Sequence, residues 1–224
     1  MAGQAAPADS DEEAELLQFK VVVVGDGEVG KTSLSTRFTE DHFAQSYRQT
    51  IGVDFFLKQL TLPGDVHVAI QLWDIGGQTL SSKMVGNYVY GAHAVLYAYD
   101  ITNLQSFQDL EDWHALVVRV CGRDRLPYLA LIANKADLTH LRTVKPERHN
   151  QFADSNNMYS YFVSAKTGDN VATTFYRVAA DLAGIVLTKP EVEVAAKAVT
   201  AQIIVHPQDL PADRIGWVAK HHSR

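Results

Sequence analysis

A glycine-rich segment that follows four consecutive valines contains residues able to bind phosphate. It reads GDGEVGKT, from Gly25 to Thr32, and fits the pattern G-x-x-x-x-G-K-[ST]. Glycines let the backbone approach phosphates closely with its N–H groups pointing inward, and a helix starting there adds a favourable dipole. Lys31 would supply charge to the terminal phosphates, and the Thr32 hydroxyl could ligate magnesium. The alternative is a glycine-rich turn that only caps a helix, but the position between a strand and a helix favours a phosphate site.

A second motif predicts which base accompanies the phosphates. NKAD, ending at Asp137, follows the apolar segment YLALIA. Asp137 could accept hydrogen bonds from the ring N–H and amino group of guanine, whereas adenine would leave this carboxylate unpaired. The segment SAKTG (164–168) offers backbone N–H groups for the guanine carbonyl, and Phe43 and the stem of Lys135 could cover the two faces of the base. Alone, NKAD could be a surface turn; after a phosphate loop, it predicts a guanine site.

Alternating patterns predict the elements that would position these residues. Apolar and β-branched runs predict strands, and amphipathic stretches predict helices between most of them. The predicted strands are 20–24, 53–60, 68–73, 94–99, 128–133 and 161–163, and the predicted helices are 31–38, 107–121, 146–156 and 171–182. The second and third strands are joined by a Pro-Gly-Asp turn and form a hairpin. We therefore expect an α/β fold of three layers, whose six-stranded, mostly parallel sheet has one antiparallel strand and helices on both faces.

Composition narrows the class of protein. The chain has 224 residues, a formal charge of −6 and one cysteine, Cys121. This charge argues against nucleic-acid binding, and no apolar run approaches the roughly 18 residues of a membrane-spanning helix. The single cysteine fits a reducing compartment. We expect a cytoplasmic monomer with a disordered acidic segment (1–17), one folded domain (18–183) and a flexible tail (184–224).

The motifs together resemble a known family. GDGEVGKT, TIG, WDIGGQ, NKAD and SAK are similar, in order and spacing, to the five signature motifs of Ras-superfamily small GTPases. QTIGVDFF, IQLWDIGGQT and YDITNLQSF resemble the Rab family, and the Gly-Gly-Gln variant with its TLPG hairpin resembles the atypical Rab twenty-eight subgroup. The resemblance implies a P-loop NTPase fold, the G domain, which binds GDP or GTP with Mg²⁺. It also implies slow GTP hydrolysis and control of vesicle and membrane traffic through GTP-dependent effector binding.

The resemblance assigns a role to each matching position. Thr32, Thr50 and Asp74 would hold Mg²⁺, Thr50 only when the γ-phosphate is present and Asp74 through a water. The nucleotide itself would be bound by Gly25, Asp26, Gly27, Glu28, Val29, Gly30, Lys31, Thr32, Ser33, Phe43, Thr50, Gly77, Asn134, Lys135, Asp137, Ser164, Ala165 and Lys166.

Hydrolysis would depend on the segment WDIGGQT. The implied catalytic residues are Gln78, which would position the attacking water, Gly77, whose N–H would contact the γ-phosphate, and Lys31. Gly76 stands where the family usually has Ala. Ordering the backbone of a Gly costs about 0.5–1 kcal/mol more in conformational entropy than ordering that of an Ala. Thr79 replaces a carboxylate that helps nucleotide exchange in relatives. We therefore expect a less favoured GTP-bound state and slow hydrolysis.

Other residues bear on how the protein is regulated. Gly27 leaves space beside the phosphates for an arginine from a GTPase-activating protein, and Glu28 is expected to point to solvent. Arg48 could be a built-in arginine of this kind, but a solvated loop charge is the favoured interpretation. Gly76, Thr79, Glu28 and the missing anchor keep open an alternative, a constitutively nucleotide-bound interaction module with negligible GTPase activity.

The expected partners are a GTPase-activating protein, an exchange factor and trafficking effectors that contact the segments around Thr50 and Gln78. Exposed apolar residues at Phe55, Phe56, Trp73 and Met84 could form the effector surface, or could pack within the hairpin and sheet. The sequence ends VAKHHSR, without prenylation cysteines or a polybasic patch. We therefore expect no direct lipid anchor and recruitment by partners to endomembranes or cilium-associated membranes.

Overall fold

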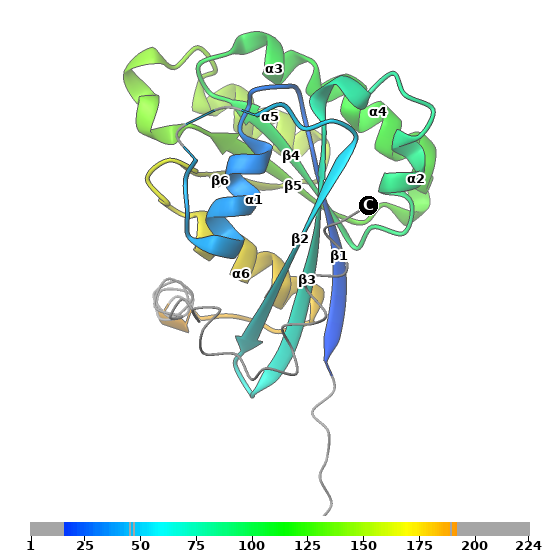
Figure 1. Cartoon of the computed structure of the whole chain (residues 1–224), viewed down its shortest axis with the longest axis vertical. Coiled ribbons are helices and arrows are strands. Elements are labelled where there is room, and N and C mark those ends of the chain that lie inside the picture. The colour runs from blue at the N-terminus through cyan, green and yellow to red at the C-terminus, as the bar shows by residue number, and fades with distance from the viewer. Residues whose placement is uncertain (1–15, 45, 47, 189, 192–224) are drawn as a thin grey trace, which may run out of the picture.

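A twisted six-stranded sheet forms the centre of the computed structural model, which describes residues 16–44, 46, 48–188 and 190–191 (Figure 1). The strand order is β2-β3-β1-β4-β5-β6. β2 pairs antiparallel with β3, and every other neighbouring pair is parallel. The strands are β1 (Leu17–Val24), β2 (Val53–Leu62), β3 (Val66–Ile75), β4 (Ala94–Asp100), β5 (Tyr128–Asn134) and β6 (Tyr159–Phe162). The predicted fold class, including its single antiparallel strand, is confirmed.

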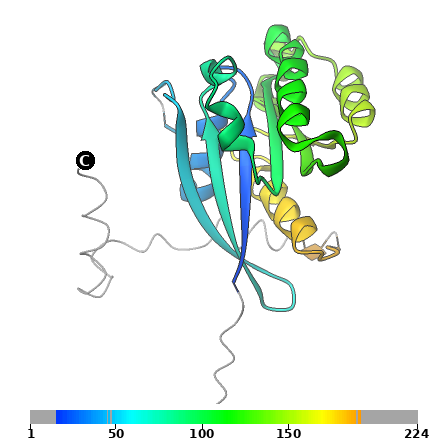
Figure 2. The ribbon, with the colours of Figure 1, turned by 90° about the vertical axis from the view of Figure 1, so that its right-hand side faces the viewer.

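Helices cover both faces of the sheet. The helices are α1 (Lys31–Glu40), α2 (Val85–Val89), α3 (Leu104–Gln108), α4 (Leu110–Cys121), α5 (Pro146–Ser155) and α6 (Val171–Leu182), with 3₁₀ turns at Gly77–Thr79, Arg123–Arg125 and Ala136–Leu141. α1 and α6 pack on one face, and α2, α4 and α5 pack on the other. Figures 1 and 2 show the β2–β3 hairpin turning at the lower end of the molecule.

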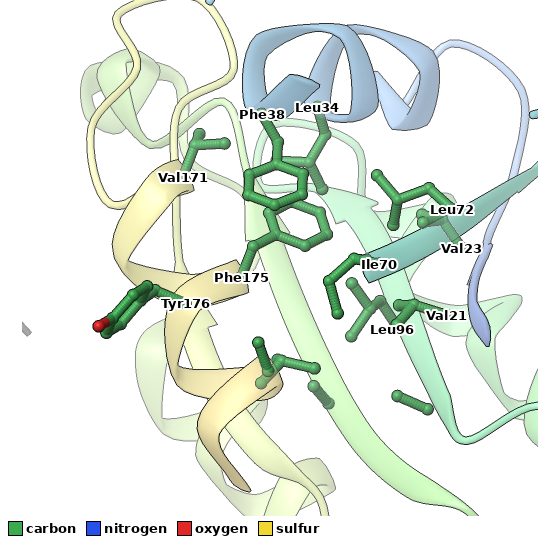
Figure 3. Close-up of a cluster of buried hydrophobic side chains, with 14 of the residues drawn as sticks. Val21, Val23, Leu34, Phe38, Ile70, Leu72, Leu96, Val171, Phe175 and Tyr176 are labelled. Carbon is green, nitrogen blue, oxygen red and sulfur yellow. The ribbon is translucent and has the colours of Figure 1, made fainter. Parts of the chain in front are cut away.

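The core beneath α1 fixes the helix that follows the phosphate-loop motif. Phe38 stacks on Phe175 of α6 with ring centroids 4.1 Å apart, and Leu34 is buried beside them (Figure 3). Sheet residues such as Val21 and Ile70 belong to the same buried cluster. Because these side chains are close-packed, the start of α1 is held at a defined position against the end of β1.

Two local predictions need correction. The predicted helix 107–121 is two helices, since α3 ends at Gln108 and α4 begins at Leu110. α3 starts earlier than predicted because the Asn103 side chain caps it, accepting hydrogen bonds from the N–H groups of Gln105 and Ser106. The short helix α2 was not predicted, because five residues are too few to show a helical period.

The packed residues extend slightly beyond 18–183 at both ends. β1 begins at Leu17, and Ile185 and Leu187 pack against the core cluster under α1 and α6. Most of the predicted acidic segment and of the predicted C-terminal tail lies outside the described residues. Among the described residues, no helix is both long enough and apolar enough to cross a bilayer.

Candidate nucleotide-binding site

A cavity of about 730 Å³ lies where loops after β1, β3, β5 and β6 meet the start of α1. The sequence-predicted residues on its wall are Gly27, Glu28, Gly30, Lys31, Thr32, Ser33, Phe43, Thr50, Gly77, Gln78, Asn134, Lys135, Asp137, Ala165 and Lys166. Arg48, interpreted above as a solvated loop charge, is exposed and also lines the cavity. The other wall residues are Thr36, Ala44, Ser46, Gln49 and Leu138. These residues were not predicted from the sequence. Only Thr36 could have been, because it lies one helical turn after Ser33 and therefore on the same face of the helix.

The remaining predicted residues stand behind this wall. They are Gly25, Asp26, Val29, Asp74 and Ser164. Val29 is buried, and its carbonyl accepts a hydrogen bond from the Asn134 side chain at 2.8 Å. The Asp26 carboxyl accepts from the Trp113 indole at 3.3 Å, and burial together with neighbouring Asp109 raises its pKa to about 6. These residues support the loops rather than form the cavity surface.

The backbone of the phosphate loop requires glycine at its first and last glycine positions, Gly25 and Gly30. Gly25 has φ +134°, and a Cβ atom there would lie 2.1 Å from the Ala98 carbonyl oxygen. Gly30 has φ +92°, and its Cβ would lie 2.5 Å from the Asn134 amide nitrogen. A side chain is excluded at both positions, because φ is positive and no space remains for a Cβ atom. The two positions allow the loop to curl tightly against β4 and the NKAD segment.

Lys31 is folded into this loop. Its ammonium donates hydrogen bonds to the carbonyl oxygens of Gly25 at 2.8 Å and Asp26 at 2.6 Å, and the side chain is only 6% exposed. Burial lowers its pKa to about 8, while the nearby carboxylates of Asp74 and Asp26 act in the opposite direction. The protein therefore holds a desolvated positive charge where a phosphate anion would stabilise it.

Three oxygen-bearing side chains converge beside Lys31. The Thr32 hydroxyl lies 2.8 Å from the Thr50 hydroxyl and donates to Asp74 Oδ2 at 2.5 Å. Asp74 is fully buried, and its Oδ1 atom has no hydrogen-bond partner among the described residues. Burial raises the pKa of this carboxyl group. A buried, unpaired carboxylate oxygen next to two hydroxyls fits the hard oxygen ligands that Mg²⁺ prefers.

The NKAD and SAK segments are tied to the phosphate loop and to each other. The Asn134 side chain also accepts from the Ala165 N–H at 3.1 Å, and Ser164 donates to Asp137 Oδ1 at 2.6 Å. This cross-linking aligns Asp137 with the cavity that Phe43 lines. The loops predicted to bind phosphate and to read the base are therefore joined into one site.

Sequence comparison agrees with this geometry. The sequence profile of the Ras family matches residues 20–183. The chain belongs to the Ras family. It is 41% identical over 206 residues to the Ras-related protein Rab-28 of Caenorhabditis elegans, covering 92% of this chain and 83% of that protein. Like other Ras-family small GTPases, the protein binds guanine nucleotides and hydrolyses GTP.

An ion pair that sequence reasoning missed completes the base side of this Ras-family site. The Lys135 ammonium lies 2.7 Å from Asp100 Oδ2 and donates to the Glu28 carbonyl at 2.9 Å. Asp100 ends β4 and also accepts hydrogen bonds from Thr102. The sequence could have indicated Asp100 as a site residue. It follows a predicted parallel strand, and ligands bind at the carboxyl ends of the strands in such sheets.

The segments around Thr50 and Gln78 contact one another closely. We call residues 48–52 switch I and residues 76–79 switch II. A Cβ atom at Gly77 would lie 2.1 Å from the Gly27 nitrogen, and a Cβ atom at Gly76 would lie 2.5 Å from the Thr50 carbonyl oxygen. Gly76 also donates its N–H to the Gly52 carbonyl at 2.9 Å. Gly76 therefore permits a tight contact between the switches. This contact is separate from the backbone-entropy cost that the sequence predicts for Gly76.

The predicted effector residues separate into two groups. Phe55 is 61% exposed and Met84 is 53% exposed, whereas Phe56 packs against the core under α1 and α6. Phe55 meets Trp73 edge-to-face with centroids 4.4 Å apart, and the Lys20 ammonium lies 3.9 Å from the Trp73 ring centroid. The structure therefore leaves Phe55 and Met84 available on the surface and assigns Phe56 to packing.

Proposed function

We propose that this Ras-family protein is a slow Mg²⁺-dependent GTPase switch that regulates vesicle and membrane traffic through GTP-dependent effector binding. The observation that carries the proposal is the meeting of Thr50 with Thr32 and Asp74, while Gly77 packs against the phosphate loop. Both switches thus touch the phosphate side of the cavity. GTP and GDP can shift the conformations of the two switches only if they contact the switches differently.

The proposed mechanism assigns hydrolysis to positioning and electrostatics. Lys31 would neutralise phosphate charge, the Gly77 N–H would contact the γ-phosphate, and Gln78 would orient the attacking water. Thr32, Thr50 and Asp74 would hold Mg²⁺, which would supply positive charge to stabilise the phosphates during hydrolysis. Gly27 is exposed, and a Cβ there would meet nothing within 4 Å, so an arginine from an activating partner could enter beside it.

Partners would recognise the protein through the two switches and the apolar surface next to them. Phe55 and Met84 supply exposed apolar area, and the partly buried Trp73 lies beside Phe55 of β2 and Tyr88 of α2. We propose that effectors, an activating protein and an exchange factor use this face, and that a cytoplasmic monomer is recruited by partners to endomembranes or cilium-associated membranes. The resemblance to Rab proteins supports this role.

Amide hydrogen exchange tests the switch directly. The protein would be loaded with GDP or with a non-hydrolysable GTP analogue, each with Mg²⁺, and exchange would be followed in peptides covering Thr50 and Gln78. We expect faster exchange of both peptides with GDP, because loss of the γ-phosphate releases them. Equal protection in both nucleotides would instead support the constitutively bound interaction module. Peptides from α6 serve as an internal reference.

A further inference from the structure

Arg37 makes hydrogen bonds to the SAK loop (164–168), which the Asn134 side chain of the NKAD motif also holds. It lies in α1, and its side chain is only 17% exposed. Its Nε donates to the Ala165 carbonyl at 3.0 Å, and Nη2 donates to the Lys166 carbonyl at 2.9 Å. The Ala165 N–H is already held by Asn134. Ala165 is therefore fixed through both its N–H and its carbonyl group.

The loop that Arg37 holds is a rigid turn. The Gly168 N–H donates to the Ser164 carbonyl at 2.8 Å, and the Ser164 N–H donates to the Asp169 carbonyl at 3.0 Å. The Ser164 hydroxyl accepts from the Thr167 N–H and donates to Asp137. Displacement of this turn would consequently be transmitted to Asp137, the carboxylate proposed to read guanine.

The same guanidinium also fixes the loop that leads to Phe43. Its third nitrogen, Nη1, donates to the Asp41 carbonyl at 2.9 Å and lies 3.3 Å from the Asp41 carboxylate. Asp41 ends α1 in a left-handed conformation (φ 50°), two residues before Phe43 on the cavity wall. Arg37 thus joins the two loops that flank the proposed base position.

We propose that Arg37 is a positioning residue for guanine recognition, which sets the SAK turn and the Phe43 loop at a fixed separation. The inference rests on the proposed guanine site. Only a planar guanidinium, with three donor nitrogens, can satisfy three carbonyl oxygens in this arrangement. A lysine at residue 37 would keep the charge, but its donors all lie on one nitrogen and cannot reproduce the spread of the three guanidinium nitrogens over the three carbonyl oxygens.

Competition binding with GDP and IDP tests the role, because IDP lacks only the 2-amino group that Asp137 is proposed to read. We expect Arg37→Lys to bind GDP about tenfold more weakly, corresponding to one lost charge-assisted hydrogen bond. The preference for GDP over IDP should also fall severalfold. Arg37→Gln, which shortens the side chain and removes the charge, should show the same trend. Lys58→Ala is the matched control, since Lys58 donates to the Thr39 carbonyl in α1 and does not contact the SAK turn.

The outcomes distinguish a positioning role from general stabilisation. If Arg37→Lys and Arg37→Gln weaken GDP and IDP by the same factor, or change neither, the inference is overturned while the guanine site stands. If the wild type itself shows no preference for GDP over IDP, the proposed guanine site fails first. A changed GDP-to-IDP preference in Lys58→Ala would also count against a specific role for Arg37.

Discussion

Gly76 lies against the backbone of Thr50, with no room for a methyl group between them. A Cβ atom at residue 76 would approach the Thr50 carbonyl oxygen to 2.5 Å and the Gly52 carbonyl oxygen to 3.3 Å. The backbone of Gly76, at φ −57° and ψ 130°, is accessible to any residue, so space rather than conformation demands glycine. Gly76 therefore does more than disfavour the ordered GTP-bound state, as expected from its sequence, because it also lets switch II approach switch I.

We predict that Gly76→Ala slows GTP hydrolysis. The added methyl group must push switch I outward, and overpacking of this kind costs about 1–3 kcal/mol. Because Thr50 would then leave Thr32 and Asp74, single-turnover hydrolysis should slow by about tenfold. Quench-flow or phosphate-release measurements on GTP-loaded protein would show the change.

Gly86→Ala is the control for that experiment. A Cβ at Gly86 would meet only the Val120 side chain, at 3.4 Å, far enough for small adjustment. Its hydrolysis rate should match the wild type. A Gly76→Ala variant that hydrolyses GTP as fast as the wild type, or faster, would contradict the proposed importance of the contact with Thr50.

The sequence predicted most of the residues that line the cavity, but it did not predict the contacts that join their loops to one another. Motifs such as GDGEVGKT are local, so their residues and spacing predict a phosphate loop before any fold is known. The Gly76–Thr50 contact and the Arg37 grip join residues far apart in the chain, and no local pattern encodes their separation. Similarly, the hydrophobic pattern runs through Asp109 and gives no sign of the break between α3 and α4 there.

Asp100→Asn should accelerate GDP release. The substitution removes the negative charge 2.7 Å from the Lys135 ammonium, which also holds the Glu28 carbonyl of the phosphate loop. We expect about fivefold faster release, corresponding to roughly 1 kcal/mol. Stopped-flow displacement of fluorescent GDP measures this rate. Asp65→Asn, in the exposed β2–β3 turn, is the control; equal rates for Asp100→Asn and wild type would refute the link.

Removal of magnesium should separate wild type from Asp74→Asn. With EDTA, wild-type protein should lose GDP much faster, because the proposed Thr32 and Asp74 ligands no longer stabilise the phosphates through the ion. Asp74→Asn should release GDP rapidly with or without EDTA. Asp54→Asn, the exposed register partner of Asp74 on β2, should behave as wild type. Full EDTA sensitivity in Asp74→Asn would exclude Asp74 from the metal site.

Stability should decrease in mild acid because of His149. This side chain is fully buried between the Tyr99 and Ser160 hydroxyls, and burial lowers its pKa to about 4. The unfolded chain takes up the proton near the ordinary pKa of about 6.5, so acid favours unfolding between these values. Urea unfolding should show about 2 kcal/mol lost to this group between pH 7.5 and 5. His149→Gln should remove that part of the loss; an unchanged pH dependence would contradict the assignment.

The most direct test of the central claim is single-turnover GTP hydrolysis by purified wild type and Gln78→Leu, both with Mg²⁺. We expect slow phosphate release from the wild type and its near abolition in the variant, with GTP affinity retained, because Gln78 acts on the attacking water rather than on binding. No phosphate release from wild-type protein that keeps its GTP over many hours would contradict the account and support a nucleotide-bound interaction module. Equal release from both proteins would remove Gln78 from the mechanism.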